Sequence, residues 1–207
     1  MIQSLSFRTG PVSAGLIVAA ATLAWTCAAQ AQPAPSNAKD LGVSGSIPNL
    51  CVLGQFSQSD ITPLVNAASI GTGTVEILNL RDETTLSTAS ASISLAFDGM
   101  CNYPHRLSLE SSNNGLFRTN ATTENVAGFG TAIPYTATIS WGGVDTVFEA
   151  YATRRGISNK SQLIASPSAG ALQLSVLIRA GATNTRDGAP LVGGLFSDTL
   201  RITVEPQ

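Results

Sequence analysis

The chain has 207 residues, 43% of them hydrophobic, with 13 acidic and 11 basic side chains and a formal net charge of −2. The charges are spread along the chain without a run of basic residues, and nothing in this balance indicates binding to nucleic acid or to an anionic membrane surface. The length and apolar content are sufficient for one domain with a sizeable core.

The first segment, residues 1–31, has the order of a secretory signal peptide. Arg8 precedes an apolar run at residues 14–25, and Ala29-Gln30-Ala31 supplies a small-residue cleavage site. The run is shorter than the about 20 residues that span a bilayer as a helix. We therefore expect cleavage after the signal, export through the inner membrane and no stable membrane insertion. A lipoprotein interpretation of Cys27 competes, but the residues before it are unfavourable for lipidation.

Two cysteines, Cys51 and Cys101, remain in the exported part, residues 32–207. An even pair in an oxidising compartment predicts one disulfide bond. A metal pair and a reactive thiol are the alternatives. They lack support because the only histidine of the chain is His105.

Segments with alternating apolar and polar residues recur through the exported part, and this period of two is typical of half-buried β-strands. Residues 32–39 are expected to be extended and mobile. The first strand is predicted from Leu41 to Leu53 with a bend at Pro48, and a Ser- and Asp-rich loop follows it. Residues 152–170 are interpreted as a polar surface excursion. The further predicted strands are 74–80, 92–98, 105–110, 116–117, 133–141, 144–151, 171–179 and 196–204.

No segment has apolar residues at helical spacing, and turn signals such as Asn113-Asn114-Gly115 recur. The predicted fold is therefore an all-β antiparallel sandwich of about seven strands, in a single domain. The segment 133–141 should supply the heaviest part of the core. Its core-facing residues are Tyr135, Ala137, Ile139 and Trp141.

The last predicted strand follows the double glycine Gly193-Gly194, which indicates a turn. Leu200, Ile202 and Val204 fall on one of its faces. An apolar edge strand invites unwanted pairing and must be covered. What covers this strand is the main question that the sequence raises.

Few side chains offer catalytic chemistry. His105 alone could serve a nucleophilic site, and we interpret it as a surface or hydrogen-bonded structural histidine. Asp82-Glu83 and Asp98 are interpreted as turn or strand-end carboxylates. We therefore expect neither an enzyme nor a bound metal or cofactor.

Three stretches resemble the spore coat protein U domain, a family similar to the pilin subunits of archaic chaperone-usher pili. They are residues 43–51 (VSGSIPNLC), residues 93–101, and residues 193–204 (GGLFSDTLRITV), whose glycine, aromatic, Ser-Asp-Thr and alternating order is the most specific. The similarity covers about residues 41–205. Two departures are the loosely matching segment after the first cysteine and the longer irregular stretch at 144–170.

The resemblance implies an immunoglobulin-like sandwich that lacks its final strand. A periplasmic pilus chaperone first fills the resulting hydrophobic groove, and the N-terminal segment of the next subunit then replaces it at the outer-membrane usher. The groove-edge residues are Phe196, Leu200, Ile202 and Val204. The donor segment is about residues 32–47, and its groove-facing positions are Leu41, Val43, Gly45 and Ile47. Alternatively, these four residues belong only to the subunit's own first strand.

The expected function is therefore a structural subunit of a cell-surface fibre or coat, assembled with like subunits in a homo- or heteropolymer. A monomeric secreted binding module, for example for carbohydrate, is the alternative from another class of protein. A hydrolase is the third and weakest hypothesis, because no partner carboxylate for His105 is evident.

Overall fold

The chain divides into two units, residues 1–45 and 46–207. In the first unit, the described residues form no helix or strand and are exposed. The predicted signal peptide lies outside the described residues. The computed structural model describes residues 39, 41–55, 61–71, 73–121 and 125–207.

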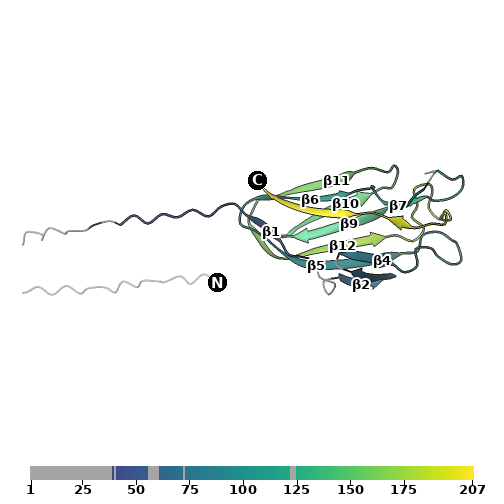
Figure 1. The fold of residues 1–207 in the computed structure, drawn as a ribbon, viewed down its shortest axis with the longest axis horizontal. Coiled ribbons are helices and arrows are strands. Elements are labelled where there is room, and N and C mark those ends of the chain that lie inside the picture. Colours follow the sequence, from purple (N-terminus) through teal and green to yellow (C-terminus); the bar gives the residue numbers. More distant parts are fainter. Residues whose placement is uncertain (1–38, 40, 56–60, 72, 122–124) are drawn as a thin grey trace, which may run out of the picture. The chain divides into compact units, whose positions relative to one another are not determined.

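The second unit is built from antiparallel β-strands, and the described residues contain no helix, hence none that could cross a membrane (Figure 1). This confirms the predicted all-β antiparallel class and is consistent with an immunoglobulin-like sandwich. The strands are β1 (Cys51–Leu53), β2 (Ile61–Val65), β3 (Ala67–Gly71), β4 (Thr74–Ile77), β5 (Ala91–Cys101), β6 (His105–Ser111), β7 (Leu116–Arg118), β8 (Ala132–Ile133), β9 (Tyr135–Trp141), β10 (Val144–Ala150), β11 (Ser158–Ile164), β12 (Ser168–Ile178), β13 (Phe196–Ser197) and β14 (Leu200–Pro206).

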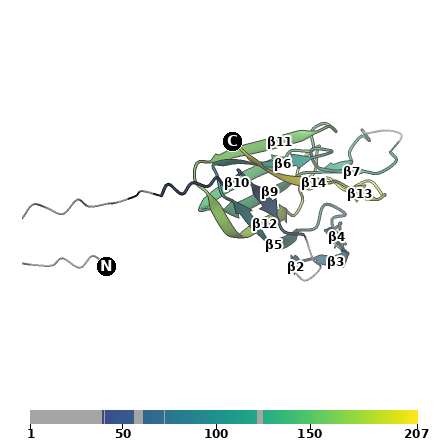
Figure 2. The same ribbon diagram turned by 60° about the vertical axis from the view of Figure 1, so that its left-hand side comes forward.

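Two sheets enclose the main core (Figure 2). The larger has the order β1-β5-β12-β9-β10, with β2 also paired to β5, and the smaller has the order β11-β6-β14. Along β6 and β9 every second residue is buried, as expected for strands with one face on a core. The fully buried large side chains from the two sheets are Leu107, Leu109, Ile139, Ile164 and Leu172. Burial of each such side chain contributes roughly 1.5–3 kcal/mol.

Two short sheets complete the unit. One has the order β13-β7-β8, and the other is the β3–β4 hairpin, which pairs with no further described strand. The predicted strand at 133–141 is interrupted at Pro134, and the predicted strand at 196–204 is interrupted at Asp198 and Thr199. Proline removes a backbone donor, which accounts for the first interruption.

The predicted strand from Leu41 to Leu53 is wrong over most of its length. Only Cys51–Leu53 forms a strand, which pairs with β5, and residues 41–50 form none. A strand requires a partner for its backbone groups. In the described part of the chain only Pro48 and Leu50 of this segment have such partners, in the backbone and side chain of Asn102.

Two regions predicted as irregular contain strands. The polar stretch 152–170 includes β11 and the start of β12, and the loop after Leu53 includes β2 and β3. Among the described strands β11 is paired only with β6, and its residues 159–163 are all exposed. An exposed edge strand of this kind has no apolar alternation by which the sequence could reveal it.

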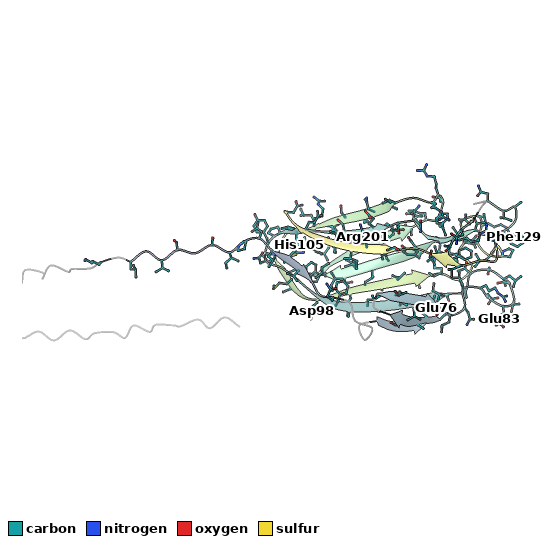
Figure 3. All side chains as sticks on the ribbon, in the orientation of Figure 1. Glu76, Glu83, Asp98, His105, Phe129 and Arg201 are labelled. Atoms are coloured by element: carbon teal, nitrogen blue, oxygen red, sulfur yellow. A yellow bond between two sulfur atoms is a disulfide. The ribbon has the colours of Figure 1, made fainter. Side chains whose placement is uncertain are left out.

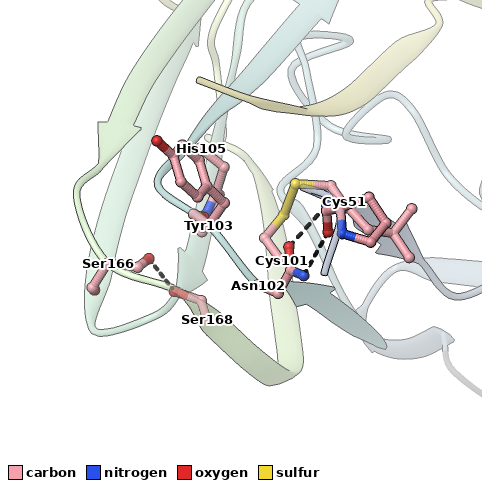
Figure 4. The surroundings of a disulfide bond; sticks show 9 residues. Cys51, Cys101, Asn102, Tyr103, His105, Ser166 and Ser168 are labelled. Atoms are coloured by element: carbon pink, nitrogen blue, oxygen red, sulfur yellow. Dashed lines mark hydrogen bonds between the residues drawn. A yellow bond between two sulfur atoms is a disulfide. The ribbon is translucent and has the colours of Figure 1, made fainter. Parts of the chain in front are cut away.

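The predicted disulfide is confirmed between Cys51 and Cys101, which are directly opposed on β1 and β5. The side chain of Asn102 fixes the chain just before β1 (Figure 4). Its Oδ1 accepts a hydrogen bond from the Leu50 amide at 2.8 Å, and its Nδ2 donates to the Pro48 carbonyl at 2.9 Å. β1 is therefore attached to the larger sheet by a covalent bond as well as by its short ladder.

Removal of this bond should destabilise the protein strongly. The sequence separation of 50 predicts that the Cys51→Ser, Cys101→Ser double variant loses about 4 kcal/mol of unfolding free energy, in the chain-entropy model. Urea unfolding followed by tryptophan fluorescence measures the loss. Chemical reduction of the unsubstituted chain is the matched control and should give a similar shift. A change below about 1 kcal/mol in both samples would contradict the assignment of a structural disulfide.

Candidate functional site

The last strand, β14, has a ladder on one side only. It pairs antiparallel with β6 from Leu200 opposite Ser111 to Pro206 opposite His105. No other described strand pairs with it. In Figure 1 it is the long yellow arrow that ends at the C-terminus.

The backbone of β14 presents alternate residues to its open side. The amide of Ser112 donates to the carbonyl of Thr199 at 3.0 Å, immediately before the strand. Hydrogen-bonded and non-hydrogen-bonded positions alternate in an antiparallel ladder. The odd-numbered residues therefore bond to β6, and the N–H and C=O groups of Leu200, Ile202 and Val204 point away from it. These groups form an unpaired edge that can accept a further strand.

The side chains of the same three residues pack against the main core and are partly buried. Arg201 lies on the other face, where it forms an exposed ion pair with Glu110 at 3.8 Å (Figure 3). Leu200, Ile202 and Val204 thus share the core-facing side of the strand, although Thr203 is also partly buried. The predicted groove-edge residue Phe196 lies in β13 and also packs against the core.

An apolar pocket of about 470 Å³ opens beside Leu200 and Ile202. Its volume is about three times the roughly 150 Å³ of an apolar cavity that binds benzene. β5 and β12 provide its floor, and the β3–β4 hairpin provides the side opposite β14. The floor residues are Ala91, Ser92, Ile93, Leu95, Leu174, Val176 and Ile178. We call this pocket, together with the open edge of β14, the edge groove.

The carboxylate of Asp198 fixes the end of the edge groove where β14 begins. Its Oδ2 accepts hydrogen bonds from the hydroxyls of Ser111 at 2.6 Å and Tyr135 at 2.8 Å. Its Oδ1 accepts from the amides of Asn113 at 3.0 Å and Thr199 at 2.7 Å. The side chain thereby joins the start of β14 to the turn after β6 and to β9. It also accounts for the break between β13 and β14.

Tyr135 contributes a permanent donor to this arrangement. Burial raises the pKa of its phenol well above the ordinary value, and the charge of Asp198 raises it further. The hydroxyl therefore stays protonated at any physiological pH. Both Tyr135 and Asp198 line the pocket.

Loss of the Asp198 carboxylate should destabilise the second unit. The Asp198→Ala variant leaves the buried hydroxyl of Ser111 and the phenol of Tyr135 without their acceptor, which should cost about 3 kcal/mol. Thermal and urea unfolding measure the loss. Asp187→Ala, at an exposed loop aspartate, is the control and should stay within about 0.5 kcal/mol. Equal stabilities of the two variants would contradict the role given to Asp198.

At the opposite end of β14, buried rings support the strand. His105 is fully buried, opposite Pro206, and its Nδ1 lies 2.9 Å from the carbonyl oxygen of Tyr103. Its ring packs at 4.7 Å from that of Trp141. His105 is therefore a hydrogen-bonded structural residue and not a surface one.

The predicted donor residues are exposed in the structure. Leu41 and Val43 are 87% and 88% exposed, Ile47 is 85% exposed, and Gly45 has no neighbouring atom where a side chain would begin. None of the four lies in a strand. Such exposure of large aliphatic side chains at alternate positions is unfavourable in water.

The sequence did not reveal the side of the groove that faces β14. Val75 and Ile77 line the pocket from the hairpin, and Leu116 lines it from β7. The alternation at 74–80 showed that the first two share one face of a strand. It contained no signal for what that face contacts, because the opposing residues lie far along the chain.

The carboxylates considered for catalysis do not converge. Asp82 accepts hydrogen bonds from Thr84 and Thr85 in its own turn, and the Thr85 bonds chiefly lower its pKa. Glu83 and Asp98 lie at different ends of the unit (Figure 3). Within the described part of the chain, no three His, Cys, Asp or Glu side chains lie close enough together to hold a metal ion.

Neither a scan of protein-family models nor a comparison with curated protein sequences gives a match to this chain.

Proposed function

We propose that the protein is an exported structural subunit of a cell-surface fibre or coat, completed at the edge groove by a strand of a neighbouring subunit. The observation that supports this most directly is the open edge of β14. Its unpaired backbone groups lie beside an apolar pocket that the described residues leave unfilled.

A single added strand would satisfy both features of the groove. Its main-chain groups would pair with Leu200, Ile202 and Val204, and every second side chain would enter the pocket. This is β-augmentation, in which the ladder provides affinity and the pockets provide selectivity. A small ligand in the pocket would leave the strand edge unpaired.

The segment at residues 41–47 has the composition required of such a strand. Leu41, Val43 and Ile47 alternate with small or polar residues, and all three are exposed. Burial in another subunit would remove these side chains from water. The resemblance of the chain to spore coat protein U domains supports the same assignment.

Before assembly, a subunit with an open groove would aggregate unless another protein covered the groove. A periplasmic pilus chaperone and an outer-membrane usher are therefore the proposed partners before the like subunits. The predicted export signal and the disulfide agree with a route through the periplasm to the cell surface. No cofactor takes part in this assembly.

Assembly should depend on the donor face of residues 41–47 and not on its other face. Val43→Asp places a charge at a groove-facing position and should abolish polymerisation, because burial of an unpaired charge is strongly unfavourable. Ser44→Asp adds the same charge one residue later, on the opposite face, and should polymerise like the unsubstituted chain. Size-exclusion chromatography with light scattering and electron microscopy distinguish fibres from monomers.

Deletion of residues 32–45 is the stronger form of this experiment. It should leave the protein monomeric or chaperone-bound, since the deleted segment contains the proposed donor. Unchanged fibres after the deletion would exclude this segment as the donor. A stable, soluble monomer of the full exported chain without any chaperone would favour the secreted binding module instead.

A further inference from the structure

The β3–β4 hairpin is separate from both main sheets. β3 pairs only with β4 in the described structure, and the hairpin is attached at its base through Asn66. The Asn66 amide group donates to the carbonyls of Asn79 at 2.6 Å and Ser90 at 3.1 Å, and its Oδ1 accepts from the Asn79 amide at 2.8 Å. Asn66 also has a positive φ of 53°, which turns the chain from β2 into the hairpin.

One face of the hairpin contacts the core beside the edge groove. Val75 and Ile77 are partly buried against the main core and line the pocket. Thr74 and Glu76 are exposed, and of these two only Thr74 also lines the pocket. A two-stranded hairpin is only marginally stable by itself. Its position therefore depends on what its inner face packs against.

The pocket volume of about 470 Å³ is more than twice the roughly 150 Å³ of an apolar cavity that binds benzene, so it has room for two neighbouring groove-facing side chains. Such residues lie about 6.6 Å apart along a strand, the same spacing as Leu200 and Ile202 opposite them. Within residues 41–47, Leu41 and Val43 are the adjacent pair of large aliphatic residues with this spacing. Ile47 has Gly45 as its neighbour on the same face. This match holds whether the incoming strand runs parallel or antiparallel to β14.

We propose that the β3–β4 hairpin is the selective side of the groove, and that Val75 and Ile77 enclose Leu41 and Val43 of a second copy of this chain. The inference rests on the proposed function and adds the residues that recognise the donor. β14 supplies a ladder that any strand could use. The hairpin then distinguishes strands by the size of two adjacent side chains.

A peptide of residues 38–48 tests this recognition. The acceptor is the full exported chain with Leu41→Asn and Val43→Asn, so that its own segment does not compete. Fluorescence anisotropy of the labelled peptide measures the dissociation constant. The acceptor that also carries Val75→Ala and Ile77→Ala should bind about tenfold more weakly, because the enclosed side chains lose their contacts.

Glu76→Ala is the matched control, since Glu76 lies between the two residues on the exposed face of β4 (Figure 3). The dissociation constant of the peptide for this variant should lie within about twofold of that for the parent acceptor. A peptide with Leu41→Ala and Val43→Ala should bind with an about tenfold higher dissociation constant. A peptide with Ile47→Ala should change the dissociation constant by about twofold or less.

A second measurement does not depend on substituting the hairpin. A benzophenone at position 43 of the peptide should crosslink to residues 67–77 of the acceptor, as located by mass spectrometry. Binding with unchanged affinity for the hairpin variant, or crosslinks only outside 67–77, would overturn this inference and leave the proposed function intact. No binding of the unsubstituted peptide would overturn both.

Discussion

About half of the backbone groups of β14 have no partner within the described chain, and the other elements of the edge groove lie beside this strand. The backbone groups of the odd-numbered residues of β14 bond to β6, whereas the N–H and C=O groups of Leu200, Ile202 and Val204 point to the open side. Unpaired backbone groups beside an apolar surface are unfavourable and invite another strand. The side chains of the same three residues border that surface. One added strand would therefore both pair the edge and bury the apolar surface.

The structure holds this edge in place from both of its ends. At the start of β14, the Asp198 carboxylate connects three elements through hydroxyl and amide donors. At its end, Pro206 lies opposite His105, whose buried ring packs against that of Trp141. Preorganisation of a receiving edge lowers the entropy lost when a partner binds. The same fixed ends that stabilise the monomer thus favour the addition of a strand.

The sequence predicted those parts of the fold in which one segment carries its own signal. The two faces of β14 and the Cys51–Cys101 bond followed from local alternation and from an even cysteine pair. The far side of the edge groove could not be predicted, because the β12 and β14 residues that line the pocket with Val75 are about 100 and 125 positions away, and alternation does not identify a partner. The segment 41–50 shows the same limit. Its pattern is that of a strand, but a pattern does not state whether the partner lies in the same chain.

The disulfide also has a mechanical consequence for the proposed fibre of such subunits. Cys51 is the first residue of β1, and its bond to Cys101 closes residues 51–101 into a covalent ring that contains β2, β3 and β4. Tension applied through the N-terminal segment would enter at Cys51 and pass directly through the sulfur atoms to the end of β5. The segment 51–101, which includes the β3–β4 hairpin, would therefore not be stretched by this tension. Pulling on the N-terminal segment would thus not unfold the subunit beginning at β1.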